Sequence, residues 1–180
     1  MAVKAMPHAL APFAPALDLP ISAIEVDAIR SDGDRLDLTY RLVGVTPQLC
    51  LPEMATAQRA DELWRHTCLE VFMQAVGETS YLEFNFSPSG QWAGYRFEDY
   101  RLGMTASEVV PNLAIQRTRN GLELTARLCL PAFAKVNWRL ALCAVIESVE
   151  GHYSYWSLAH PPGKPDFHHP RSFALTLAGG

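Results

Sequence analysis

Apolar and polar residues alternate along most of the chain. In one run, Leu82, Phe84 and Phe86 would face one side of an extended segment, and Glu83 and Asn85 the other. Successive side chains of a β-strand point to opposite faces, so this period of two predicts half-buried strands. The pattern predicts about ten strands in all, at residues 22–29, 35–42, 67–74, 80–87, 91–97, 112–118, 122–128, 138–148, 153–158 and 172–177.

Short turn sequences separate these runs, as at residues 87–90 and 119–121. Helical signals are confined to residues 52–63 and to one turn at 131–135, where Pro131 suits a first helical position. Many strands without a strand–helix alternation predict an all-β fold. We therefore expect an antiparallel β-sandwich of jelly-roll type, with one or two short helical turns.

Composition narrows the class of protein. The 180 residues suit one domain, and a 49% hydrophobic share argues against disorder. A net charge of -4 argues against a nucleic-acid partner, which requires a basic surface. Since no apolar run approaches the roughly 20 residues that span a bilayer, no membrane partner is expected.

Prolines interrupt the N-terminal segment. Pro7, Pro12 and Pro15 leave no continuous apolar stretch of the kind found in a signal peptide. We expect an extended arm over residues 1–19, laid across a single domain at residues 20–180. A cytoplasmic location is favoured over secretion, and the sequence does not specify an oligomeric state.

The four cysteines are far apart and form no CxxC pair. They are Cys50, Cys68, Cys129 and Cys143, and the last three lie in apolar, strand-like runs. Such residues usually act as small core hydrophobes, so four free thiols are predicted.

Three segments, read in order, resemble the DOMON-like domains, which are related to family 9 carbohydrate-binding modules. Trp64 leads into a strand containing Glu70-Val71-Phe72, a hairpin follows with Glu83-Phe84-Asn85, and residues 155–169 contain His160-Pro-Pro-Gly-Lys-Pro-Asp-Phe-His-His169. The resemblance extends over roughly residues 20–178. It implies a β-sandwich that binds sugars or haem and does not catalyse a reaction.

Sugar recognition needs flat aromatic faces beside polar groups. Trp92 shares its predicted strand face with Gly94 and Arg96, where the missing side chain at Gly94 would leave room for a sugar ring. The alternatives are that the aromatic residues fill the core and that Glu70 forms a structural pair with an arginine. The candidate ligand-binding residues are Trp64, Arg65, Glu70, Asn85, Trp92, Arg96, Tyr155 and His168.

Two other functions stay open. His160, Asp166 and His168 could ligate a divalent metal, as in a metal-binding protein or a metal-dependent hydrolase. A structural or protein-interaction module would show no coherent pocket. No cofactor is expected, since no spacing selects the axial ligand pair that haem would need. No catalytic residue is predicted, because the only candidate, an acid/base pair of Glu70 with Glu83, would require a proximity that the sequence does not show.

Overall fold

The chain folds into antiparallel strands. The computed structural model describes residues 6–15, 19–31, 33–45, 47–131 and 135–179. In this part of the chain, the helical elements are the 3-10 turns η1 (Leu63–Arg65) and η3 (Pro170–Ser172). The strands are β1 (His8–Pro12), β2 (Ala23–Ser31), β3 (Arg35–Val43), β4 (Cys68–Ala75), β5 (Tyr81–Phe86), β6 (Trp92–Phe97), β7 (Thr105–Ala106), β8 (Asn112–Thr118), β9 (Gly121–Cys129), β10 (Trp138–Glu147), β11 (Tyr153–Ser157) and β12 (Leu175–Leu177).

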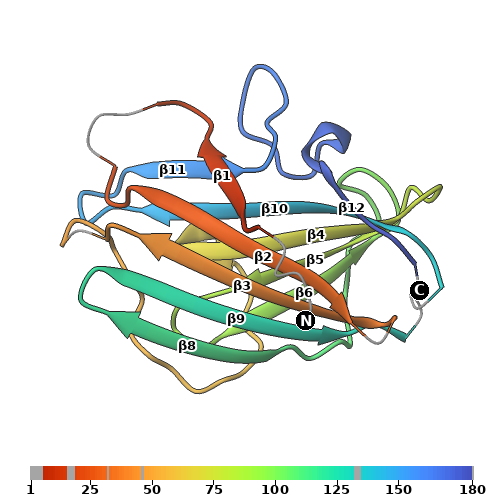
Figure 1. Ribbon diagram of the computed structural model, residues 1–180, viewed down its shortest axis with the longest axis horizontal. Coiled ribbons are helices and arrows are strands. Elements are labelled where there is room, and N and C mark those ends of the chain that lie inside the picture. Colours follow the sequence, from red (N-terminus) through yellow and green to blue (C-terminus); the bar gives the residue numbers. More distant parts are fainter. Residues whose placement is uncertain (1–5, 16–18, 32, 46, 132–134, 180) are drawn as a thin grey trace.

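The strands form one strongly curled sheet whose two halves face each other (Figure 1). The first layer consists of β2, β3, β9 and β8, and the second of β7, β6, β5, β4, β10, β11 and β12. Strand β1 joins them, because Leu10 pairs with Ile24 of β2 while Ala11 pairs with Ser157 of β11. The predicted all-β antiparallel architecture is confirmed.

Two predicted segments have a different local structure. The arm expected over residues 1–19 contains β1, which forms part of the sheet rather than lying across its surface. Residues 52–62 form no helical turn, because they run beside the end of β6: Ala60 donates its N–H to the carbonyl of Trp92, and Trp92 donates to that of Gln58. The turn predicted at 131–135 lies partly outside the described residues.

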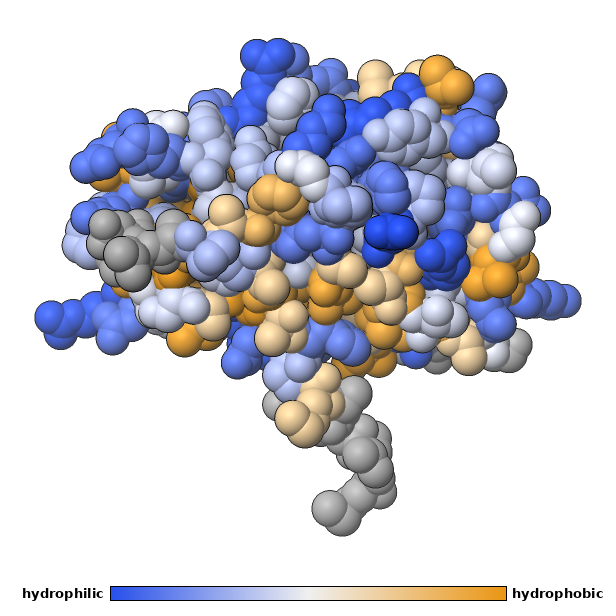
Figure 2. All heavy atoms as spheres, turned by 90° about the horizontal axis from the view of Figure 1, so that it is seen from above, coloured by the Kyte–Doolittle hydropathy of each residue, from blue (hydrophilic) through white to orange (hydrophobic). Residues whose placement is uncertain are grey.

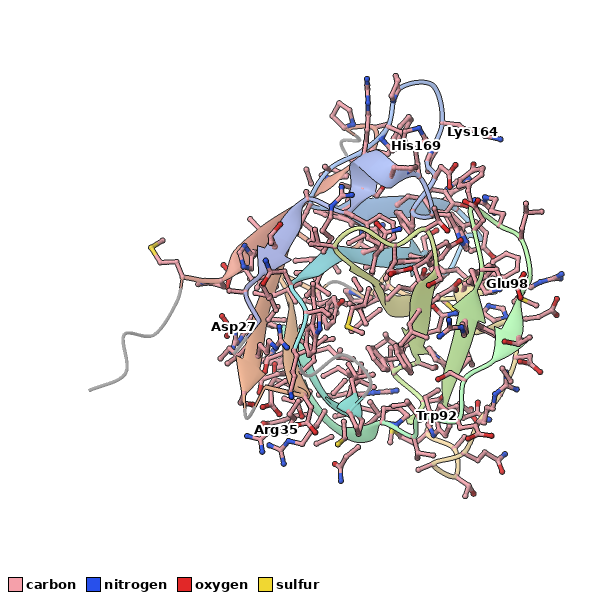
Figure 3. The ribbon with its side chains drawn as sticks, turned by 90° about the vertical axis from the view of Figure 1, so that its right-hand side faces the viewer. Asp27, Arg35, Trp92, Glu98, Lys164 and His169 are labelled. Carbon is pink, nitrogen blue, oxygen red and sulfur yellow. The ribbon has the colours of Figure 1, made fainter. Side chains whose placement is uncertain are left out.

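The main core lies between the layers, where alternate residues of each strand meet (Figure 3). In β3, Leu38, Tyr40 and Leu42 are buried, while the residues between them are partly exposed. The Tyr40 hydroxyl donates a 2.6 Å hydrogen bond to the backbone carbonyl of Glu70 on the opposite layer. Figure 3 shows Asp27 on the outer side of the first layer.

The central strands of the second layer, β4 and β5, are buried on both faces. All six residues of β5 are buried, although Tyr81, Glu83 and Asn85 point away from the main core. Phe167 and Phe173 pack on this outer face in a second apolar cluster. The outer face is therefore a second interior, and the site described below opens over it.

The molecular surface seen from above, relative to the view of Figure 1, carries both hydrophilic and apolar side chains. Figure 2 shows hydrophilic side chains over most of this face, with apolar ones gathered in a band along one side. Among the described residues, no helix has both the length and the apolar character needed to cross a bilayer.

Candidate functional site

A cleft of about 1200 Å³ opens over the outer face of the second layer. Its floor comes from β4, β5 and β6, which contribute Glu70, Glu83 and Tyr95. Its walls come from residues 59–65, residues 104–106, β11 and residues 165–168. The cleft exists because these four chain segments surround the outer face without filling its centre.

Two buried carboxyl groups lie in the floor. Glu70 and Glu83, on the paired strands β4 and β5, are only 3% and 5% exposed. Asn85, directly opposite Glu70 in the strand register, donates a 2.9 Å hydrogen bond from Nδ2 to Oε1 of Glu83. Oε1 of Glu70 and Oδ1 of Asn85 are buried and find no hydrogen-bond partner within the described part of the chain. Buried polar atoms are nearly always paired, so these two acceptors mark an unusual floor.

Burial shifts the ionisation of this pair. It raises the pKa of Glu83 to about 7, against a partly compensating hydrogen bond from Asn85. Burial also raises the pKa of Glu70 well above its ordinary value, and the neighbouring charge of Glu83 raises it further. Two carboxyls in a low-dielectric site without a cation favour their neutral forms. The floor therefore holds protons close to neutral pH.

His168 borders the two carboxyls. Its Nδ1 is 2.8 Å from the Tyr81 hydroxyl, and its Nε2 is 3.7 Å from Oε2 of Glu83. The ring also contacts that of Phe72 edge-on, with 4.9 Å between centroids. Burial lowers the pKa of His168 to about 4, with a further contribution from the charge of Arg101. The imidazole is therefore neutral at pH 7.

Asp166 fixes the loop that carries His168. Its carboxylate accepts hydrogen bonds from the Tyr100 hydroxyl at 2.6 Å and from Arg101 Nη2 at 2.8 Å. Burial acts to raise the pKa of Asp166, but these two hydrogen bonds hold it below its ordinary value. The carboxylate also accepts the backbone N–H of His168 at 3.2 Å. Asp166 is thus ionised, and it holds the backbone N–H of His168 in place.

Aromatic side chains line the walls. The Tyr95 hydroxyl donates to Oδ1 of Asp61 at 2.7 Å, which fixes the ring in place. Tyr155 is 36% exposed and contacts Phe167, with 6.2 Å between ring centroids. Trp64 is 47% exposed beside the cleft. Tyr155 and Trp64 therefore leave ring surface accessible near polar groups, which suits the apolar and hydroxyl-bearing sides of a sugar, whereas Tyr95 is buried.

The structure brings five of the eight predicted ligand-binding residues to the cleft. They are Trp64, Arg65, Glu70, Tyr155 and His168. Asn85 does not line the cleft but supports its floor through Glu83. The expected Glu70–arginine pair is not formed, because Arg65 instead pairs with Glu62 at 2.8 Å.

Trp92 and Arg96 lie on the other face of β6. Trp92 is 9% exposed and belongs to the main core, while Arg96 is exposed. The space expected beside Gly94 is filled, since a Cβ there would lie 2.9 Å from the Phe84 ring. The room for a sugar ring that was predicted on this face is therefore absent, because Trp92 and Gly94 pack into the core and only Arg96 reaches solvent.

Sequence reasoning left Glu83 and Tyr95 out of the ligand-binding set, although both line the cleft. The period of two in β6 does predict that Tyr95 and Trp92 lie on opposite faces of the strand. The sequence does not indicate which of these faces meets the core, because aromatic residues occupy both.

The alternative metal site is not assembled. Nε2 of His160 is 2.8 Å from the backbone carbonyl of Ala11, and its ring packs edge-on against Phe13. His160 therefore contacts the segment around β1, whereas Asp166 and His168 line the cleft. Among the described residues, no three His, Cys, Asp or Glu side chains lie together in an arrangement that could hold a metal ion.

Comparisons with known proteins bear on the fold. No protein-family description and no curated protein matches the sequence. Among solved structures, a proposed carbohydrate-binding protein from Bacteroides uniformis superposes with a TM-score of 0.64 and 14% identity, over 88% of this chain and 78% of that one. A family 9 carbohydrate-binding module from Caldicellulosiruptor kristjanssonii, solved with glucose, gives a TM-score of 0.51 and 10% identity, over 84% and 72% of the two chains.

The fold is similar to that of these two proteins. At these identities the likeness establishes the carbohydrate-binding-module-like architecture alone, since one fold can host unrelated functions.

Proposed function

We propose that this chain binds a saccharide or a sugar-containing metabolite in the cleft, without catalysing a reaction, and that it is a DOMON-like domain. The observation that carries the binding proposal is the floor: Glu70 lines the cleft, and its buried Oε1 has no hydrogen-bond partner among the described residues. An unmade hydrogen bond on a buried polar atom costs stability, so such atoms are retained where a ligand satisfies them. Sugar hydroxyls are donors of the required kind.

The walls support the same ligand class. Tyr95, Tyr155 and Trp64 provide rings beside the polar floor, and a pyranose has one apolar and one hydroxyl-bearing side. The likeness to a glucose-bound family 9 module and the sequence resemblance in residues 63–72 and 81–92 support the proposal independently.

Titration calorimetry with a panel of mono- and disaccharides tests the proposal. The informative variant is Trp64→Ala, because a side chain that is 47% exposed can be removed without opening a core cavity. Loss of ring stacking should weaken binding by about 1–3 kcal/mol, or roughly 5- to 150-fold. Ile29→Ala is the matched control, since Ile29 is 52% exposed on β2 of the other layer.

Wild-type protein that binds no saccharide of the panel at millimolar concentration would overturn the proposal. Equal affinities of the wild type and the Trp64→Ala variant would place the sugar elsewhere on the molecule.

A further inference from the structure

The carboxyl groups of the cleft outnumber its cationic side chains. Its three arginines each have a carboxylate partner, in the pairs Arg59–Asp61 at 2.9 Å, Arg65–Glu62 at 2.8 Å and Arg101–Asp166 at 2.8 Å. Glu70 and Glu83 line the same cleft, and among the described residues neither forms an ion pair with a lysine or arginine. The cleft thus has two more carboxyl groups than cationic side chains.

Neighbouring groups do not supply the missing cation. His168 is 3.7 Å from Glu83 but is neutral at pH 7, because burial holds its pKa at about 4. Arg101 acts on Glu83 through its charge, yet its guanidinium is bound to Asp166. Lys164 is exposed and extends away from the molecule at the tip of its loop (Figure 3).

The unsatisfied atom of the cleft floor belongs to Glu70. Among the described residues, its Oε1 has no hydrogen-bond partner, and the residue is nine-tenths or more buried. Asn85, opposite it in the strand register, directs its amide to Glu83 instead. A carboxylate at this position only accepts hydrogen bonds, so a ligand group that meets it must bring donors, and a positive charge would also offset the burial of the carboxylates.

Aromatic rings complete the enclosure. Phe72 lies in the floor beside Glu70 and is 1% exposed, and Tyr155, at 36% exposed, stands in the wall. Tyr95 also lies in the wall, with the Arg59 guanidinium 5.3 Å from its ring centroid. The faces of such rings attract cations, most strongly where water is excluded. Acidic acceptors surrounded by aromatic rings are the chemistry that recognises an ammonium group.

We infer that the cleft takes a ligand bearing a protonated amine, such as an amino sugar, with the ammonium group against Glu70 and Glu83. This inference rests on the proposed function, since it names the ligand class for the same cleft. An ammonium group offers three donors and one positive charge, whereas a sugar hydroxyl offers one donor and no charge.

Matched probes test the inference by titration calorimetry at neutral pH. Glucosamine is compared with glucose and N-acetylglucosamine, which share its ring but lack the charge, and ethanolamine is compared with ethylene glycol. Hydrogen bonds to a charged group are worth more than neutral ones, so glucosamine should bind at least about tenfold more tightly than either neutral sugar. The variants Glu70→Gln and Glu83→Gln should each abolish this preference.

Glu25→Gln is the control for the loss of a negative charge, since Glu25 lies on the outer side of β2 in the first layer. It should leave the preference for glucosamine unchanged. Thermal melts of all variants establish that they are folded before binding is compared.

The outcomes separate the inference from the proposed function. Neutral sugars that bind as tightly as glucosamine would overturn the inference and leave sugar binding standing. A preference for ethanolamine without binding of any sugar would uphold the amine site and overturn the sugar proposal. Absence of binding by every probe would overturn both.

Discussion

Replacing Glu83 with glutamine should stabilise the protein relative to the wild type, and this difference in unfolding free energy should grow as the pH rises. Glutamine keeps the length of the side chain and an Oε1 atom that can accept the hydrogen bond from Asn85 Nδ2. It replaces the ionisable oxygen of the carboxyl group by an amide nitrogen that does not titrate. The effect of pH on the difference between the two proteins therefore reports the ionisation of Glu83 in the folded state.

The sign and size follow from the shifted pKa of Glu83. Its ordinary value of 4.5 applies to the unfolded chain, and burial raises it to about 7 in the folded protein. Between these values the folded state binds more protons, so stability is lost as the pH rises through the window. Between about pH 5 and about pH 8, the loss from this group amounts to about 2.5 kcal/mol. The Glu83→Gln variant does not lose this stability, because glutamine does not titrate.

Glu70 adds to the effect in the same direction. With glutamine at position 83, the repulsion between the two carboxylates disappears, and the ionised form of Glu70 becomes less costly. The variant should therefore gain about 2.5 kcal/mol or more over the wild type across this range of pH.

Urea unfolding followed by tryptophan fluorescence measures the difference, because Trp138 and Trp156 are buried in the core. The Glu25→Gln variant, which changes a carboxylate on the outer side of β2, should show no such dependence. If the free-energy difference between Glu83→Gln and the wild type were the same near both pH values, Glu83 would be ionised normally in the folded protein. Burial would then not keep Glu83 protonated near neutral pH, and the floor of the cleft would be ionised.

Three other perturbations are informative. His168→Gln should stabilise the protein relative to the wild type as the pH falls from 6.5 to about 4. In that range the histidine is protonated in the unfolded chain but not in the folded protein, so the wild type loses stability. Urea unfolding at both ends of the range measures the difference, and an opposite trend would contradict the prediction. Trp92→Ala should cost about 3–5 kcal/mol in unfolding free energy because it opens a core cavity, and a melt as high as that of Trp64→Ala would contradict this core position. Titration with a thiol reagent should find four free thiols after denaturation, with exposed Cys129 reacting first in the native protein and buried Cys68 and Cys143 not reacting until unfolding; fewer than four would indicate a disulfide.

Much of the strand arrangement was predictable because a period of two is a local property. In β3 and β9, buried and partly exposed residues alternate as the sequence indicates, since one face of each strand meets the core and the other meets solvent. Strand β1 was not predicted, because His-Ala-Leu-Ala-Pro shows no clear alternation. Its place in the sheet depends on partners distant in the sequence.

The candidate site was predictable only in part, because the second layer has two apolar faces. On β6, Trp92 and Tyr95 look equally suited to a core or to a ligand, and only the packing of the first layer shows that Trp92 is the core residue. The loop at residues 160–169 presents a related problem. Its prolines restrict the backbone, but they do not determine that His160 binds to the carbonyl of Ala11 while His168 reaches Tyr81.

The position of β1 affects the order in which the chain can fold. This strand pairs with both β2 and β11. Strand β2 follows it at once, whereas Ser157 and Trp156 of β11 are far from it in the sequence. Contacts so distant in the sequence are slow to form, because a long loop must close first. The two halves of the curled sheet therefore cannot be joined through β1 until β11 has been synthesised, so β1 can pair with β2 long before it pairs with β11.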